Sequence, residues 1–393
     1  MLSGFRVLDL TWVLGGPFAG QLLAQLGAEV IKIETLKGDL SREVPPHWIH
    51  GDSAYYLSVN RGKKSIALDL KTADGAEVFR DLVKTADAVI YGFAPDVPAR
   101  LGIDHDSLKK INPSICVAEL IGLHDEGEYS RAPAYDLIVQ AMGGVMSITG
   151  SEGGEPARVG YQVGDLSGGL FLALSLTGAL AATARDGKGR KVQVSLLDCQ
   201  VAMLTWQAQN YFASGEIPVA RGSRNPVLAP SETYECADGR HLAISPTGDN
   251  FWRKFCDIVG RPDLVTDEKF ATRAARIENG LALSDILGAI FRQHPAQHWA
   301  DLFFAERVPA AKVHNVAEAV EQPVALLRGM VETLAKPGTG EETRFLGNPF
   351  KYEGRTPLGY PPGHGAHSGD VLRDLCGYDE ARIDDLIQKQ AIK

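Results

Sequence analysis

The segment RVLDLTWVLGGPFAGQLLAQLGAEVIKIE, residues 6–34, decides the fold. A short apolar strand at 6–10 is followed by a loop, by the helical sequence FAGQLLAQLGA and by the apolar strand EVIKIE. A strand, a helix and a second strand in close succession begin a parallel, doubly wound sheet. We therefore predict an α/β fold with a Rossmann-like large domain.

Such a unit also suggests a dinucleotide site, with Glu34 as the acid that binds a ribose. The spacing of Gly15, Gly16 and Gly20 does not match G-x-G-x-x-G. Pro17 occupies the place of the second glycine, and the loop before Gly15 is too long for a tight phosphate-binding turn. An NAD-dependent dehydrogenase is therefore a weak hypothesis. Binding of NAD would support it.

The alternation of strands and helices continues along the chain and then stops. Further strands are predicted at 65–70, 88–92 and 114–120, and a polar loop at 38–58 is expected to cover a cleft. Later segments contain a hairpin signal around 237–239, amphipathic helices and one short strand. The predicted organisation is a large Rossmann-like domain at 1–206, a linker at 207–230, a small α+β domain at 231–314, a linker at 315–356 and a return to the large domain at 357–393.

Composition narrows the class of protein. A chain of 393 residues is too long for one ordinary core, and 45% hydrophobic with 23% charged residues is typical of a soluble globular protein. The net charge of -9 argues against nucleic acid or an anionic membrane as partner. An anionic ligand must therefore meet a local basic cluster.

The cysteines and the apolar segments suggest a location. Five cysteines lack metal-ligand spacing and are odd in number, so we predict reduced thiols, a cytoplasmic protein and no metal site. The first residues run directly into a strand, which argues against a signal peptide. The uncharged run Leu166–Ala184 is long enough to cross a bilayer, but its serine, threonine and glycine residues favour a buried helix.

One acid, Asp165, stands at the start of this run, between Gly164 and the pair Gly168–Gly169. The simplest interpretation is an N-cap, because a carboxylate satisfies the free N–H groups of a helix start. The glycines favour a second interpretation, because they remove side chains around the acid and allow another molecule to approach it. Asp165 is therefore a candidate reactive group.

Several motifs occur together and resemble one family. The set VLDLTWVLGGPFAGQLLAQLGAEVIKIE, NRGKKSIALDLK, YDLIVQAMGGVMSITG, VGDLSGGLFLALSLTGAL and GKGRKVQVSLLD is similar to the class III CoA-transferases. That family includes formyl-CoA transferase and carnitine CoA-transferase and is related to the 2-methylacyl-CoA racemases. The resemblance covers nearly the whole chain. It implies a homodimer of two chains linked like rings, with 207–230 and 320–356 as the threads, since structureless connections of this length are unusual inside one domain.

The resemblance also implies a reaction. The acid that matches the family's nucleophile is Asp165, which would form a mixed anhydride with an acyl group and then an aspartyl-CoA thioester. CoA would move from an acyl-CoA to a free carboxylic acid, with acyl-CoA as substrate and no tightly bound cofactor. The backbone N–H groups of Gly164, Gly168 and Gly169 would hold the developing oxyanions.

The remaining site residues carried over by the resemblance all concern CoA. They are Leu14 and Gly15 along the CoA tail, Lys63 and Arg100 near its phosphates, Phe93 beside its adenine, and Tyr135 near the nucleophile. Lys and Arg suit phosphate groups. From the residues alone, a solvated position for the two cations and core packing for the two aromatic residues are the favoured interpretations.

Departures from the family affect the substrate. Thr35 and Gly92 stand where formyl-CoA transferase has Arg and Asn, and the glycine-rich loop over its nucleophile has no counterpart in residues 221–232. We therefore expect an acceptor acid other than oxalate and larger than it. The loop residues Arg221 and Arg224 are candidates for contacting its far carboxylate.

Two other functions stay open. The racemase branch uses a histidine where Tyr135 precedes Asp136 here, and a tyrosine with a pKa near 10 is a poor proton shuttle. A non-catalytic acyl-CoA-binding protein is the alternative from another class. A bare carboxylate beside a thioester argues against it, because binding alone does not need one.

Overall fold

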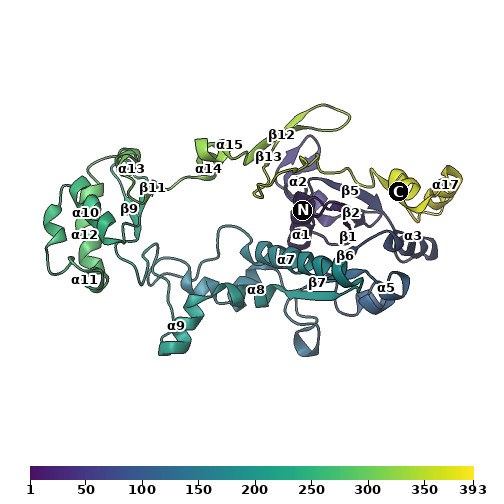
Figure 1. The fold of residues 1–393 in the computed structure, drawn as a ribbon, viewed down its shortest axis with the longest axis horizontal. Coiled ribbons are helices and arrows are strands. Elements are labelled where there is room, and N and C mark those ends of the chain that lie inside the picture. Colours follow the sequence, from purple (N-terminus) through teal and green to yellow (C-terminus); the bar gives the residue numbers. More distant parts are fainter. The chain divides into compact units, whose positions relative to one another are not determined.

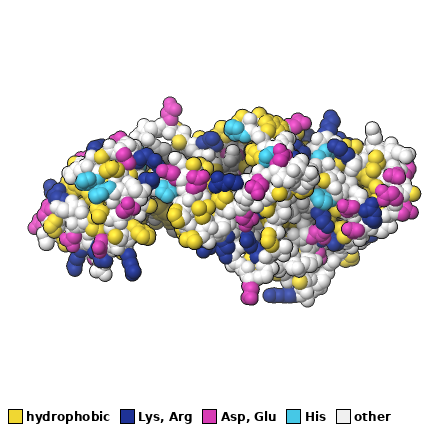
Figure 2. Space-filling view, turned by 90° about the horizontal axis from the view of Figure 1, so that it is seen from above, with side chains coloured by type: hydrophobic (Ala, Val, Ile, Leu, Met, Phe, Trp, Pro, Cys, Tyr) yellow, Lys and Arg dark blue, Asp and Glu magenta, His cyan; other side chains and the backbone are white.

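The computed structural model describes residues 1–393, which form two compact units. The large unit consists of Met1–Val145, Arg158–Gly215 and Leu326–Lys393, and the small unit of Met146–Ala157 and Glu216–Ala325. The small unit is thus inserted into the chain of the large one. Figure 1 follows the chain through both, and acidic and basic side chains are interspersed on the face drawn in Figure 2.

A six-stranded parallel sheet forms the centre of the large unit and confirms the predicted α/β class. Its spatial order is β5-β2-β1-β6-β7-β8. The strands are β1 (Arg6–Asp9), β2 (Glu29–Glu34), β5 (Lys63–Ala67), β6 (Ala88–Tyr91), β7 (Cys116–Ile121) and β8 (Lys191–Ser195). Counted along the chain this is the order 3-2-1-4-5-6, in which ligands bind at the carboxyl ends where the order reverses. Here that point lies between β1 and β6.

Helices cover both faces of this sheet (Figure 1). The first face carries α1 (Gly15–Gln25) and α7 (Val163–Asp186), whose leucines and alanines pack on the sheet. The other face carries α3 (Ala73–Lys84), α5 (His105–Ile111), α16 (Ser368–Cys376) and α17 (Glu380–Gln388). Each apolar helix face is therefore matched by one apolar face of the strands.

Glycines set the distance between α1 and α7. A Cβ atom added to Gly169 would lie 2.3 Å from the carbonyl oxygen of Gly15, and one added to Gly168 would lie 2.3 Å from Leu196 Cδ2. Neither distance is compatible with a side chain. The absence of a Cβ at Gly169 thus allows α1 and α7 to approach closely, and its absence at Gly168 leaves room for Leu196.

Alanine at position 169 is expected to destabilise the large unit by about 3 kcal/mol, because the atom it meets is backbone rather than a mobile side chain. Chemical denaturation of the full chain measures this change. Gly280→Ala is the matched control: Gly280 begins α12 (Gly280–Phe291), and a Cβ there meets nothing within 4 Å. It should change stability by no more than about 0.5 kcal/mol. Equal effects of the two substitutions would contradict this account.

Helix α7 is long and apolar enough to cross a membrane by length and composition alone. In the large unit it packs against α1, β7 and α8 (Leu196–Met203), with Leu172 and Leu176 fully buried. Its opposite side exposes Leu170 and Leu174.

Smaller elements complete the large unit. The predicted polar loop at 38–58 contains the 3-10 helix η1 (Leu40–Glu43), the short strands β3 (Trp48–Ile49) and β4 (Asp52–Ser53), and α2 (Ala54–Ser58). The hairpin of β12 (Val331–Ala335) and β13 (Glu342–Leu346) is held by Arg61, which donates to the Leu346 carbonyl and pairs with Glu332 at 2.6 Å. The remaining elements are α4 (Val97–Leu101), η2 (Gly127–Tyr129), α6 (Asp136–Met142), η3 (Val145–Ile148) and α9 (Trp206–Ser214).

The outer edge of β5 is covered by residues 391–393. The Asp69 N–H donates to the Ala391 carbonyl, the Lys393 N–H donates to the Ala67 carbonyl, and Leu68 forms a bridge with Ile392. Ile392 is buried in the same core as α3 and α16. An edge strand is thereby paired rather than left open.

The small unit contains the antiparallel sheet β11-β10-β9. Its strands are β9 (Glu232–Glu235), β10 (His241–Ile244) and β11 (Ala310–Lys312), and its helices are α10 (Asp249–Ile258), η4 (Pro262–Val265), α11 (Arg273–Glu278), α12 and α13 (Ala296–Ala305). Stacked rings of Trp252, Phe255 and Phe303 fill its core. The predicted hairpin and short strand are present.

Both segments predicted as linkers contain regular structure. Helix α9 occupies part of 207–230, and α14 (Val316–Glu321), α15 (Pro323–Leu327) and the β12–β13 hairpin occupy much of 315–356. These elements are short and lie between turn-forming residues, which concealed them from the sequence pattern.

Candidate active site

Asp165 lies in the first turn of α7, as the third residue of the helix. The helix is preceded by Gln162, so Asp165 is not the N-cap that one interpretation of the sequence predicts. A Cβ on Gly15 would lie 2.9 Å from the Asp165 carbonyl oxygen, which places the start of α1 directly beside the acid. The structure thus brings Asp165, Leu14 and Gly15 together at the carboxyl end of β1.

The electrostatic environment of Asp165 opposes its negative charge. Burial, and secondly the charge of Asp136, raise its pKa from 3.8 to about 6. The side chain is half-buried and pairs with no Lys, Arg or His. The carboxylate is therefore ionised at neutral pH but lacks the partners that would stabilise it, as expected for a reactive group.

Asp136 is a site residue that the sequence analysis missed. Its Oδ1 accepts the Gly164 N–H at 2.9 Å, and its Oδ2 accepts Gln140 Nε2 at 2.7 Å. A Cβ on Gly164 would lie 3.0 Å from that Oδ1, so glycine permits the contact. Asp136 therefore fixes the first turn of α7. Its position directly after Tyr135 was the available signal.

The predicted oxyanion role of the glycines requires correction. The Gly164 N–H already donates to Asp136. Gly168 and Gly169 lie inside α7, where backbone N–H groups bond to carbonyls four residues earlier. In this structure the three glycines serve close packing instead.

Tyr55 of α2 is a second residue without any motif in the sequence. Burial raises its pKa to about 12, and the charges of Asp165, Asp136 and Asp39 add to the effect. The phenol thus remains protonated near these carboxylates and is available as a hydrogen-bond donor. Nothing in the polar loop at 38–58 distinguished this tyrosine from Tyr56, which is fully buried.

Aromatic residues connect β1 and β6 at the point where the strand order reverses. Trp12, in the loop after β1, meets Phe93, in the loop after β6, with ring centroids 6.0 Å apart. Phe93 also stacks on Tyr91 at 5.8 Å. The predicted adenine-side residue therefore lies at the crevice that this fold uses for ligands.

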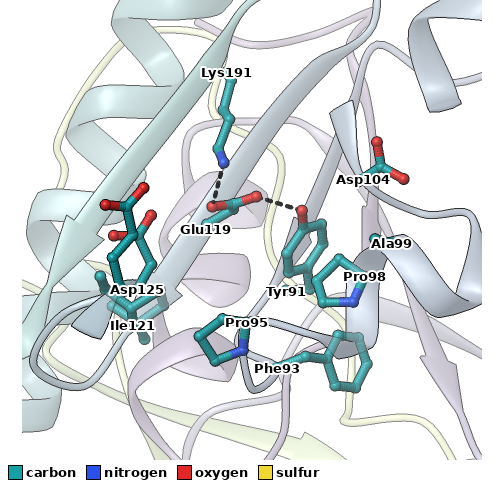
Figure 3. Close-up of a pocket in the computed structure, with 12 residues that line it drawn as sticks. Tyr91, Phe93, Pro95, Pro98, Ala99, Asp104, Glu119, Ile121, Asp125 and Lys191 are labelled. Atoms are coloured by element: carbon teal, nitrogen blue, oxygen red, sulfur yellow. Dashed lines mark hydrogen bonds and ion pairs between the residues drawn. The ribbon is translucent and has the colours of Figure 1, made fainter. Parts of the chain in front are cut away.

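A pocket of about 220 Å³ adjoins Phe93 at the ends of β6 and β7 (Figure 3). Figure 3 shows the Glu119 carboxylate between Lys191, at 2.9 Å, and the Tyr91 hydroxyl, at 2.5 Å. The lining residues are Tyr91, Phe93, Pro95, Pro98, Ala99, Asp104, Glu119, Leu120, Ile121, Asp125, Glu126 and Lys191. Its carboxylates disfavour phosphate, whereas its rings and prolines suit a planar group with amine donors.

The two predicted phosphate contacts are not brought together. Arg100 of α4 is exposed and has only Asp96 nearby, at 3.7 Å. Lys63 is buried, with its Nζ 2.9 Å from Asp9 Oδ2 and bonded to the Pro17 carbonyl and Asn60. Burial lowers the Lys63 pKa to about 8 although Asp9 opposes this. Lys63 therefore balances a buried acid here, a role that the run of basic residues in the sequence did not reveal.

Tyr135 precedes α6 and its side chain is 78% exposed. Because Tyr135 directly precedes Asp136 in the chain, it lies at the rim of the site.

Comparison with known proteins decides the family. The model of CoA-transferase family III matches residues 2–368. The chain belongs to CoA-transferase family III. It is 35% identical over 387 residues to succinate–glutarate CoA-transferase of Agrobacterium fabrum, covering 95% of each chain. It is 38% identical over 354 residues to acetyl-CoA:oxalate CoA-transferase of Acetobacter aceti, covering 90% and 89%.

A solved structure of the family has the same fold. The CAIB/BAIF family protein from Brucella suis is 33% identical, has a TM-score of 0.84, and is matched over 95% of this chain and 99% of that one. The predicted membership is thereby confirmed, and the chain is a CoA-transferase enzyme.

Proposed function

We propose that the protein moves CoA from an acyl-CoA thioester to a free carboxylic acid by covalent catalysis on Asp165. The observation that carries this proposal is a half-buried carboxylate with a raised pKa and no cationic partner, beside the loop that the family resemblance assigns to CoA. An acid in this state attacks a carbonyl without a separate base.

The reaction proceeds in balanced covalent steps. A carboxylate oxygen of Asp165 attacks the acyl carbon, the C–S bond breaks, and a mixed anhydride and CoA thiolate form. The thiolate then attacks the Asp165 carbonyl carbon, releasing the donor acid and leaving an aspartyl-CoA thioester. The acceptor carboxylate attacks that carbon to regenerate thiolate and a new anhydride, from which the thiolate takes the acceptor acyl group. No net proton transfer is required.

The acidic neighbour contributes to this chemistry. Acylation removes the charge of Asp165, so the repulsion from Asp136 that raises its pKa is released in the anhydride and in the thioester. Asp136 thus favours the covalent intermediates relative to the free carboxylate. Tyr55 would donate to the oxygen that becomes negative during attack, in place of the glycine N–H groups.

CoA would extend from this acid across the crevice. Leu14 and Gly15 would line its tail, and the pocket beside Phe93 would take the adenine ring, whose amine can donate to Asp104 or Asp125. The exposed Arg100 would meet a phosphate outside the pocket.

We propose a dicarboxylic acid as acceptor, supported by relatives named for glutarate and oxalate. Of the two loop arginines, Arg224 pairs with Glu152 at 2.6 Å within the small unit and would have to leave that pair to bind a substrate. Arg221 is exposed and is the better candidate for the far carboxylate.

Mass spectrometry of CoA exchange tests the proposal. Succinyl-CoA and acetyl-CoA are incubated with glutarate, oxalate and a panel of monocarboxylates. We expect a new acyl-CoA with at least one dicarboxylate, and hydroxylamine should trap a hydroxamate on Asp165. Binding of acyl-CoA without exchange or adduct would contradict the enzyme mechanism. Exchange of the α-hydrogen of a 2-methylacyl-CoA for deuterium would instead support the racemase function.

We also propose a homodimer, with residues 207–230 and 320–356 as the connections that let two chains interlock. Its support is the apolar surface on α6 to α9, where Ile138, Leu170, Leu174, Val201 and Phe212 are all exposed. A second copy would cover a surface of this kind.

Light scattering should therefore give twice the chain mass, and Leu174→Glu should weaken association. If the chains interlock, tagged and untagged dimers mixed in native buffer should not exchange subunits until they are unfolded. Monomeric wild-type protein would contradict the dimer, and rapid native exchange would contradict interlocking.

A further inference from the structure

The loop Thr11–Leu14 is held in a costly conformation. Val13 has a φ of 67°, and a β-branched residue in this region is strained. Such conformations are unfavourable and persist only where surrounding contacts impose them. Val13 is also 38% exposed, so its own packing is a weak source of compensation.

A buried ion pair contacts the backbone at Thr11 and at Val13. Lys32 of β2 donates to the Thr11 carbonyl at 2.8 Å. Asp39 accepts the Val13 N–H at 3.2 Å. Lys32 Nζ lies 2.7 Å from Asp39 Oδ2, and both side chains are only 1% exposed. The pair therefore fixes two backbone atoms of the loop from within the protein.

The pair is itself held rigidly. Asp39 Oδ1 also accepts the Ser41 N–H and hydroxyl, and the Asp39 N–H donates to Glu34. Burial alone would raise the pKa of Asp39, but the nearby Lys32 ammonium and these hydrogen bonds lower it. Asp39 thus remains ionised.

A role in stability alone explains this arrangement poorly. Buried ion pairs seldom stabilise a fold more than apolar residues of the same volume, because both ions lose their hydration. The contacts that an apolar pair could not supply are those to the Thr11 carbonyl and the Val13 N–H. These contacts shape the loop that precedes Gly15 and lies beside Asp165.

We propose that Lys32 and Asp39 are positioning residues that hold the loop Thr11–Leu14 in its strained conformation for binding the CoA tail. The assignment to CoA rests on the proposed function. The constraint on the loop does not, and it can be measured without ligand.

The test replaces both charges at once, so that no unpaired ion is buried. In the full chain, Lys32→Met/Asp39→Ala is expected to raise hydrogen exchange of the amides at 11–16 by about tenfold and to weaken CoA binding by about tenfold. The matched control is Arg61→Met/Glu332→Ala. It removes another ion pair, in which Arg61 is 2% exposed. That pair contacts the β12–β13 hairpin instead of the loop. The control variant should leave both values within about twofold of wild type.

Glycine at position 13 separates positioning from general destabilisation. Because glycine adopts a φ of 67° without a Cβ penalty, adding Val13→Gly to the double variant should recover about fivefold of the lost CoA affinity. Val13→Gly alone should change that affinity by less than about threefold. A purely structural role of the pair predicts no such recovery.

The outcomes are distinct. Unchanged exchange at 11–16 in the double variant, equal losses in the control, or no recovery with Val13→Gly would each overturn the proposal. If wild-type protein does not bind CoA, the proposed function fails while the exchange data still judge the constraint on the loop. If the double variant does not fold, Asp39→Asn removes the charge opposite Lys32 and keeps an acceptor for Ser41. It should raise exchange at 11–16 in the same direction.

Discussion

Replacing Asp165 by asparagine is expected to abolish CoA exchange and, at the same time, to stabilise the folded protein at neutral pH. An amide cannot form the anhydride, so the rate should fall at least ~1,000-fold. The stability change follows from linkage. The folded pKa of about 6 exceeds the ordinary 3.8, so protonation favours folding, and this contribution is lost as the pH rises through 6.

The size of the effect follows from the same difference. A shift of roughly two pKa units corresponds to ~3 kcal/mol as an upper value at pH 8. The advantage of the asparagine variant should fall to about 0.5 kcal/mol at pH 4, where the wild-type acid is protonated in the folded state and about 40% protonated in the unfolded state. Denaturant titrations at pH 4 and pH 8 measure it, with exchange assayed by mass spectrometry. CoA affinity should stay within a few-fold of wild type. Turnover within tenfold of wild type, or equal stability at pH 8, would refute this assignment.

Replacing Asp136 by asparagine should move the pH dependence of the reaction. The carbonyl oxygen of asparagine can still accept the Gly164 N–H, so the first turn of α7 keeps its anchor while the charge is lost. Only burial then raises the pKa of Asp165, and the acid limb of kcat/KM should shift down by about one unit. Because less repulsion is released on acylation, kcat at pH 8 should fall about tenfold.

The pH profile of kcat/KM between pH 4 and 8 decides this prediction. Asp106→Asn is the control, because Asp106 is 93% exposed on α5 and the substitution changes net charge equally. Asp106→Asn should leave the acid limb of the kcat/KM profile at the same pH. An unshifted limb in Asp136→Asn would mean that Asp136 serves packing alone.

Local patterns were sufficient to predict the parallel sheet, and they singled out Asp165 as a candidate reactive group. The apolar strands at 6–10 and 29–34 and the helix between them are short-range signals, and the six-stranded sheet follows them. Asp165 drew attention because glycines surround an acid at the start of a long apolar run, and its proposed role as nucleophile came from the family resemblance. The short elements of 207–230 and 315–356 lack such periodicity, since their stability depends on contacts with distant residues, as with Arg61 and Glu332.

The surroundings of the acid could not be predicted in the same way. The charge of Asp165 acts on Tyr55, although Tyr55 lies more than 100 residues earlier in the chain. No sequence spacing predicts that these two residues lie near each other. Lys63 appeared suited to phosphate, but its role is set by Asp9, a strand residue that reads as part of an apolar run. Gly168 and Gly169 correctly predicted that another group approaches closely. That group is Leu196 for Gly168 and α1 for Gly169, not a substrate oxygen.

The pairing of residues 391–393 with the segment after β5 has a consequence for biosynthesis. The ribosome synthesises residues 1–215 first, then residues 216–325 of the small unit, and only afterwards the segment that closes the sheet. Throughout that interval the nascent large unit carries an open β-edge, to which another chain could add. Expression conditions that slow late translation are therefore expected to raise the share of insoluble product.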